Sequence, residues 1–134
     1  MNLNKAILKL SLLALLIILF ACNGTTDAEW SIENQSSATI DFSYKKHLYP
    51  YDINGSLKQG EKRIIQISSE DKASQDPLVP YDVFSDMKIT NEQGEPMKKD
   101  WVDNNNWEIY IEETQTSPSK QLQTYKLVVK DQDF

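Results

Sequence analysis

The chain carries few residues that could perform nucleophilic, redox or metal chemistry. Its 134 residues include one histidine, His47, and one cysteine, Cys22. A Ser-His-Asp triad would have to use His47, and no Gly-x-Ser-x-Gly sequence is present to place a serine beside it. The HExxH, CxxC and Walker-type spacings of zinc, redox and nucleotide sites are also absent. The sequence therefore predicts no catalytic residue, no metal site and no dissociable cofactor.

Acidic residues are the remaining group with catalytic potential, and there are 20 of them. A glycosidase needs only two carboxylates about 5 to 10 Å apart, so a small carboxylate-dependent hydrolase stays an alternative, although the sequence singles out no pair. The run Asp103-Asn104-Asn105-Asn106 could offer oxygen ligands to calcium, but it lacks the alternating acids and the distant glutamate of an EF-hand. We expect this run to be a solvated turn.

Aromatic residues near His47 form the best candidate for a binding site. Exposed aromatic rings stack on sugars or anchor a protein partner, whereas rings at alternate positions of a strand usually pack in the core. Two tyrosines lie on either side of Pro50 in a polar segment, which favours exposure. The alternative is an ordinary surface loop, with the histidine beside two lysines. The residues predicted for this binding loop are Tyr44, His47, Tyr49, Tyr51 and Trp101.

The N-terminal residues have the pattern of an export signal. Lys5 and Lys9 precede an apolar run, Leu10 to Ala21, that only Ser11 interrupts. A membrane span needs about 20 apolar residues, whereas these twelve cover about 18 Å as a helix. The pattern therefore favours a signal peptide over a permanent transmembrane helix.

The apolar run ends in Leu19-Phe20-Ala21-Cys22, which resembles the lipobox of bacterial lipoproteins. The resemblance implies that the Cys22 sulfur receives a diacylglyceryl group, that a peptidase cuts after Ala21 and that the new amine is acylated. Two or more acyl chains hold a protein stably on a membrane. The alternatives are an ordinary secretory signal with a buried thiol, or a signal anchor.

The resemblance also predicts where the protein lies. We expect it at the cell membrane or, if the cell has two membranes, at the outer membrane, because Asn23 resembles residues that permit outer-membrane sorting. Residues 1–21 are then the signal peptide, and residues 22–28 are the lipidated cysteine with a polar, flexible tether that reaches about 20 Å. Cys22 is the one cysteine, so no internal disulfide stabilises the domain.

The charge of the chain argues against nucleic-acid binding. The formal net charge is −6, and the two lysines of the leader are not balanced there by any acid, so the mature part is more acidic still. Proteins bind DNA and RNA through clusters of basic residues that release counterions from the phosphates. No such cluster occurs here, so we expect no nucleic-acid partner.

Residues 29–134 read as strands, because apolar residues alternate with polar ones in several short segments. The segment around Trp30 and the segment Ile40 to Tyr44 are expected to form a hairpin, with a turn between them. The clearest pair is residues 107–112 and 125–130, in which Trp107 is expected to be buried. If these two segments are neighbours, acidic and basic residues share one solvent face, namely Glu108 and Glu112 with Lys126 and Lys130.

The other segments have weaker patterns. Tyr49 to Leu57 is expected to be a loop or a short edge strand with a tight turn at Asn54-Gly55. Residues 63–68 are expected to form a core strand with Ile65 and Ile67 on one face. Residues 69–80 are expected to be irregular, with a helical turn near residues 70–73, whereas residues 83–89 and 97–102 are expected to be strands.

Six or seven short strands with no helix-period stretch predict an all-β domain. The predicted architecture is a single antiparallel β-sandwich, similar in size to an immunoglobulin domain, with a small β-barrel as the alternative. A shared architecture does not transfer an activity. The functional hypothesis is a membrane-anchored envelope lipoprotein whose domain binds a protein or a glycan, or supports a complex. An inhibitor or immunity-type lipoprotein with one protein target is a further alternative, because the acidic charge would steer a basic target.

Overall fold

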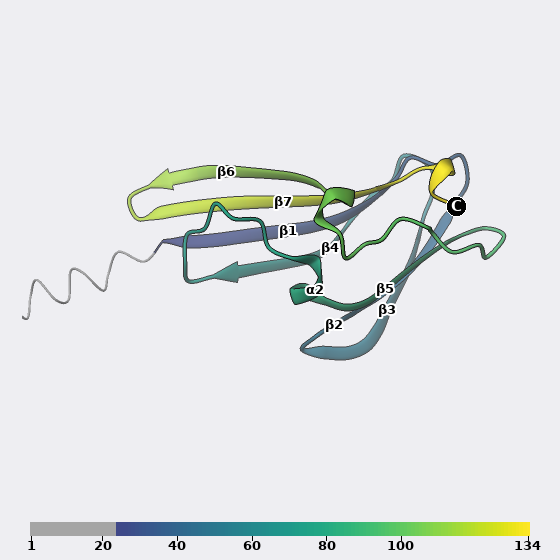
Figure 1. Cartoon of the computed structure of the whole chain (residues 1–134), viewed down its shortest axis with the longest axis horizontal. Coiled ribbons are helices and arrows are strands. Elements are labelled where there is room, and N and C mark those ends of the chain that lie inside the picture. The colour runs from purple at the N-terminus through teal and green to yellow at the C-terminus, as the bar shows by residue number, and fades with distance from the viewer. Residues whose placement is uncertain (1–23) are drawn as a thin grey trace, which may run out of the picture.

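The computed structural model describes residues 24–134, except for the side chain of Pro50. The expected signal peptide and Cys22 lie outside these residues. The domain is an all-β sandwich of two sheets, with strand orders β4-β1-β7-β6 and β3-β2-β5 (Figure 1). Between Gly24 and Phe134, no helix is long and apolar enough to cross a membrane. The elements are β1 (Thr25–Asn34), β2 (Ile40–Lys46), β3 (Tyr49–Leu57), β4 (Lys62–Glu70), α2 (Pro80–Val83), β5 (Phe84–Asn91), η1 (Asn104–Asn106), β6 (Glu108–Thr116), β7 (Ser119–Val129) and η2 (Asp131–Asp133).

The predicted sandwich of seven strands is confirmed, but one strand pair is parallel. The first and last strands, β1 and β7, run in the same direction, from Thr25 beside Lys120 to Asn34 beside Val129. The prediction of a wholly antiparallel sandwich is therefore wrong for this pair. The two strands are far apart in the sequence, so no hairpin turn sets their relative direction. Each of them also pairs with an antiparallel neighbour, β4 and β6 respectively.

The expected hairpin between the first two strands is also wrong, because β1 and β2 belong to different sheets. Each strand has one apolar face, and the two faces meet across the core instead of lying side by side. The buried side chain of Asn34 holds the crossing. Its Nδ2 donates to the carbonyl oxygens of Ala38 (2.8 Å) and Leu57 (2.9 Å), and its Oδ1 accepts from the amide of Ser36 (2.9 Å).

The strand β1 begins at Thr25, four residues before its expected start. Most of the expected flexible tether is therefore part of the sheet. Thr26 is buried although it is polar, because its hydroxyl donates to the carbonyl oxygen of Lys72 (2.7 Å) and accepts from the amide of Ser74 (2.9 Å). A polar residue whose hydrogen bonds are satisfied can occupy a core position, and the alternation of residue types does not reveal this.

The segment from Tyr49 to Leu57 is a nine-residue edge strand, and Asn54-Gly55 lies inside it instead of forming a turn. Gly55 pairs with Phe42 of β2. A Cβ atom on Gly55 would lie 2.5 Å from Cζ of the Phe42 ring and would also meet the guanidinium of Arg63. The glycine is needed here because the ring occupies the space of a side chain.

The strand β4 is an edge strand with a bulge, and this overturns the expected core face. Trp30 pairs with Gln66 and Ser31 pairs with Ile64, so Ile65 is the extra residue. The bulge shifts the alternation, so Ile65 is buried while Ile67 is 67% exposed.

Trp30 lies at the centre of the core. Its ring stacks on Tyr125 at 3.7 Å and meets Phe84 and Trp107 edge-on at 5.6 and 5.2 Å. Trp107 is buried, as predicted. Aromatic pairs in these orientations contribute about 0.5–1.5 kcal/mol each beyond the area that they bury. The core therefore joins both sheets through a few large rings.

The predicted pairing of the last two long strands is confirmed. Glu108 lies opposite Lys126, and their charged groups are 2.8 Å apart. Glu112 lies opposite Leu122, and Lys130 follows the end of β7, so Glu108 and Lys126 are the two of the four expected charged residues that lie opposite each other.

The connections differ in detail from the expected ones. The helical turn lies at Pro80–Val83, where proline favours the first turn of a helix, and not at residues 70–73. Residues 97–102 do not form a strand, and the nearby ladder is a single bridge between Thr90 and Pro96. Gly94 supplies the positive φ of 79° that the preceding turn requires.

Candidate functional site

A hollow of about 230 Å³ opens between the two sheets beside the turn that joins β2 and β3. Three segments line it. The first is the hairpin tip, the second is the inward face of the edge strand β4, and the third is α2 together with the segment that leads into it. The lining residues are Lys46, His47, Leu48, Tyr49, Gln66, Ser68, Glu70, Leu78, Asp82 and Val83.

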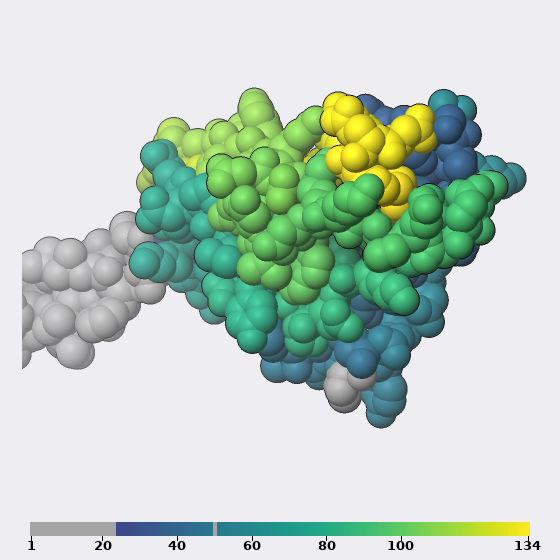
Figure 2. Space-filling model, turned by 45° about the vertical axis from the view of Figure 1, so that its right-hand side comes forward, coloured from purple at the N-terminus to yellow at the C-terminus, as the bar shows by residue number. Residues whose placement is uncertain are grey.

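Large apolar side chains are exposed in the segments that line this hollow, and two of them, Leu48 and Tyr49, line it directly. Leu48 at the tip of the hairpin is 88% exposed, and Tyr51 and Tyr49 on β3 are 77% and 62% exposed. Val79 and Tyr81 are exposed on the segment that contains α2. We name these five residues the hairpin surface. The hairpin forms a projection at the lower edge of the molecule (Figure 2). Exposed apolar groups gathered around a hollow are typical of interaction sites.

His47 joins the hairpin to α2. Its Nε2 lies 2.5 Å from the carbonyl oxygen of Tyr81, and the two rings meet edge-on at 5.5 Å. A carbonyl oxygen only accepts, so this nitrogen carries the proton and donates it to the hydrogen bond. His47 therefore positions the hairpin surface, and its Nε2 is not free to act as a base.

Lysines flank the hairpin surface. Lys45 lies 3.6 Å from the carboxylate of Asp52, and both side chains are more than one third exposed. The ammonium of Lys46 lies 5.9 Å from the centre of the Tyr44 ring. The tip of the hairpin thus carries positive charge in a protein whose net charge is negative.

The structure divides the residues that the sequence assigned to a binding loop. His47, Tyr49 and Tyr51 lie together on the hairpin, whereas Tyr44 is buried. The hydroxyl of Tyr44 donates to the carbonyl oxygen of Ile65 at 2.9 Å, and burial raises the pKa of this tyrosine. Trp101 is half-buried against the core, and its carbonyl oxygen accepts from Nε1 of Trp107 at 2.7 Å. These two residues support the fold.

Sequence reasoning missed three residues of the site. Leu48 lies between two alternating segments, and an apolar residue at such a turn has no strand face on which to be buried, so this signal could have identified it. Val79 and Tyr81 come from a segment about 30 residues further along the chain. Their place beside the hairpin depends on the packing of the two sheets.

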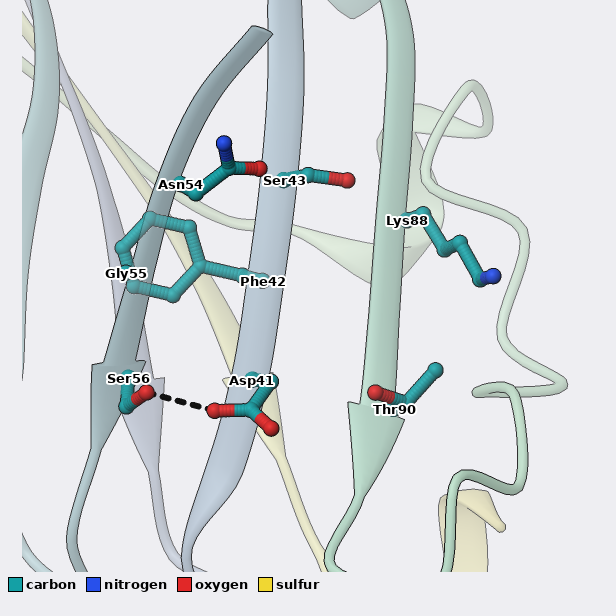
Figure 3. Close-up of a pocket in the computed structure, with 8 residues that line it drawn as sticks. All are labelled: Asp41, Phe42, Ser43, Asn54, Gly55, Ser56, Lys88 and Thr90. Atoms are coloured by element: carbon teal, nitrogen blue, oxygen red, sulfur yellow. Dashed lines mark hydrogen bonds between the residues drawn. The ribbon is translucent and has the colours of Figure 1, made fainter.

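A second hollow, of about 430 Å³, lies over the three strands of the smaller sheet (Figure 3). Polar side chains of β2, β3 and β5 surround it, and the hydroxyl of Ser56 donates to the carboxylate of Asp41 at 2.5 Å. Phe42 is buried, so this hollow offers no exposed aromatic ring. The lining residues are Asp41, Phe42, Ser43, Asn54, Gly55, Ser56, Lys88 and Thr90.

The acidic residues do not assemble a metal site in the part of the chain that the structure describes. No group of three or more His, Cys, Asp or Glu side chains there is placed to hold a metal ion. The run that begins at Asp103 forms a short 3₁₀ turn. The carboxylate of Asp103 accepts from the backbone amide of Asn105 at 2.9 Å and from its side chain at 2.8 Å.

Of the two hollows, the one beside the hairpin combines a recess with exposed apolar side chains. It is therefore the candidate functional site. No protein-family model matches the chain, and no curated protein matches it.

Proposed function

We propose that this protein is a non-catalytic lipoprotein of the bacterial envelope, lipidated at Cys22, whose β-sandwich binds a protein partner through the hairpin surface. The anchor rests on the resemblance of residues 19–22 to a lipobox. The binding role rests on one observation, which is that two exposed apolar side chains, Leu48 and Tyr49, line the hollow, while three more lie within two residues of lining residues, namely Tyr51, Val79 and Tyr81. Such groups contribute to stability when a partner removes them from water, at about 25 cal/mol per Å².

A protein partner fits this surface better than a glycan. Sugars bind to the faces of aromatic rings together with polar groups, whereas Leu48 and Val79 are aliphatic. Leu48 is also the most exposed of the five. Tyrosine and leucine side chains that project from a hairpin suit a pocket on another protein. Lys46, Glu70 and Asp82 line the hollow, so the rim of that pocket is expected to offer both acidic and basic residues.

Site-specific photo-crosslinking in cells tests the binding role. A photoreactive amino acid replaces Tyr49 in one variant and Tyr110 in a control variant. The control is matched, because both residues are strand tyrosines and they are 62% and 63% exposed. We expect an adduct of one discrete mass from position 49 and none from position 110. The same adduct is expected from position 81, because the exposed ring of Tyr81 contacts His47 of the hairpin.

A second variant tests whether the adduct depends on the apolar side chains. Leu48→Asp places a charge at the tip of the hairpin, where the side chain makes little contact with the domain. The adduct from position 81 should then be lost, while circular dichroism of the variant stays unchanged. Equal adducts from positions 49 and 110, or an adduct that survives Leu48→Asp, would contradict the proposal.

A further inference from the structure

The start of β1 is held tightly in the domain. Gly24 is buried, and a Cβ atom on it would meet the carbonyl oxygen of Ser119 and would lie 2.6 Å from Cβ of Ala73. The next residue, Thr25, pairs with Lys120 of β7. The chain therefore has a fixed position from Gly24 onward.

This fixed position leaves a very short link to the lipidated cysteine. Cys22 precedes Gly24 by two residues, and consecutive Cα atoms are 3.8 Å apart, so the two Cα atoms lie within about 8 Å. The flexible tether expected from the sequence would reach about 20 Å. A link of this length holds one end of the domain at the lipid headgroups.

Resting on the lipidation in the proposed function, we propose that the domain stands with one defined end against the bilayer. We name it the anchor end, and it consists of Gly24, the segment 72–76 and the turn 117–120. These parts lie at the same end of the molecule, opposite the C-terminus (Figure 1).

Hydrogen bonds hold the segment 72–76 beside the first strand and the last. Thr26 of β1 bonds to the carbonyl oxygen of Lys72 and to the amide of Ser74. Nε2 of Gln123 of β7 donates to the carbonyl oxygens of Ser74 (2.9 Å) and Asp76 (3.0 Å). These hydrogen bonds fix the anchor end to β1 and β7, so it cannot move independently of them.

The chemistry of the anchor end suits the headgroup layer. Lys72 and Lys120 are exposed and can face lipid phosphates, and the exposed acids nearby include Glu70, Asp71, Asp76 and Glu113, whose carboxylate accepts from the hydroxyl of Ser119 at 3.0 Å, so the surface is polar and carries both charges. The large exposed apolar residues of the domain lie elsewhere. The anchor end is thus expected to rest on the headgroups without entering the hydrocarbon.

This orientation restricts the partner of the hairpin surface. The residues of β4 that line the hollow lie opposite the first six residues of β1, since Glu70 pairs with Thr26 and Gln66 pairs with Trp30. At about 3.3 Å per residue, this part of β1 lies within roughly 20 Å of Gly24. The hollow beside the hairpin surface is therefore within roughly 20 Å of the anchor end, and it suits a partner that is itself held at that membrane.

Fluorescence quenching by lipids tests the orientation. Because Cys22 is the one cysteine and its sulfur would be in a thioether, a new cysteine can be labelled alone. Gln75→Cys labels the anchor end. Gln59→Cys is the matched control, because it is also an exposed glutamine in a connection, and the neighbouring Gly60 bonds to Asn34 at the opposite end of β1. The lipidated proteins are placed in phosphatidylethanolamine and phosphatidylglycerol vesicles that contain a nitroxide lipid.

Each new cysteine is labelled with bimane, a fluorescent group that nitroxide quenches on contact. We expect the label at position 75 to lose most of its fluorescence to the nitroxide lipid and the label at position 59 to lose none. A flexible insert of ten Gly and Ser residues after Asn23 spans about 18 Å and should remove the loss at position 75. Quenching that persists with the insert, equal quenching at both positions, or stronger quenching of a label at Leu48→Cys would overturn the orientation. Mass spectrometry of the same sample separates the two proposals, because an unmodified Cys22 thiol contradicts the proposed function, and the orientation with it.

Discussion

Single residues decide how closely the backbone and the rings can approach in this domain. Gly55 lies in the middle of an edge strand, a place where glycine costs backbone entropy and adds no packing. The Phe42 ring of the neighbouring strand and the guanidinium of Arg63 fill the space that a side chain would need, with 5.4 Å between the guanidinium carbon and the ring centre. The missing side chain thus allows the hairpin strands and β4 to pack closely.

The role of Gly55 leads to a stability prediction. Gly55→Val should lower the free energy of unfolding by about 1–3 kcal/mol, because the buried ring must move to admit the side chain. Asn54→Val is the control, since it places the same side chain one residue away on the face that is exposed, and it should change the free energy by no more than about 0.5 kcal/mol. Urea denaturation measures both. Equal losses in the two variants would refute the role given to the ring.

At the scale of the strands, one lysine links three adjacent strands of the larger sheet, β1, β7 and β6. Lys126 of β7 lies 3.0 Å from the carboxylate of Glu33 on β1 and 2.8 Å from that of Glu108 on β6. The hydrogen bond from Gln35 and then Lys126 lower the pKa of Glu33, while the bonds to Glu108 and Glu33 raise the pKa of Lys126. The charges therefore stabilise both the parallel and the antiparallel pairing of β7.

This charge cluster predicts a dependence of stability on pH. The pKa of Glu33 is lower in the folded protein than its ordinary value of 4.5, so its ionised form stabilises the fold above that pH, and the contribution is lost as the pH falls through the lower value. Glu33→Gln should reduce the free energy of unfolding by about 0.5–1 kcal/mol at pH 7 and by less near pH 3. Glu112→Gln, opposite Leu122, is the control and should have no effect. A Glu33→Gln effect that is the same at both pH values would be inconsistent with this account.

At the scale of the whole molecule, the sequence could predict the sandwich because alternation of residue types reports one buried face per strand. Trp107 shows this, and so does the pairing of Glu108 with Lys126. The parallel pairing of β1 with β7 could not be predicted, because it joins segments about 95 residues apart and depends on how the sheets assemble. The bulge at Ile65 also lies outside any local pattern.

In the candidate site too, some features follow from local sequence patterns and others depend on how the sheets assemble. The exposure of Tyr49 and Tyr51 could be predicted from the polar segment around Pro50. Tyr44 is buried, as its alternation with Ile40 and Phe42 indicates, so its assignment to the binding loop is wrong. The hollow itself could not be predicted, because its walls come from both sheets and from the segment before α2.

The central claim is that this β-sandwich is held at a membrane through lipid on Cys22 and acts there by binding. Mass spectrometry of the protein purified from membranes of its own cells tests the anchor most directly. The account predicts an N-terminal peptide that begins at Cys22 and carries a diacylglyceryl thioether. A peptide that continues upstream of Cys22, or one with a free thiol at that residue, would contradict it.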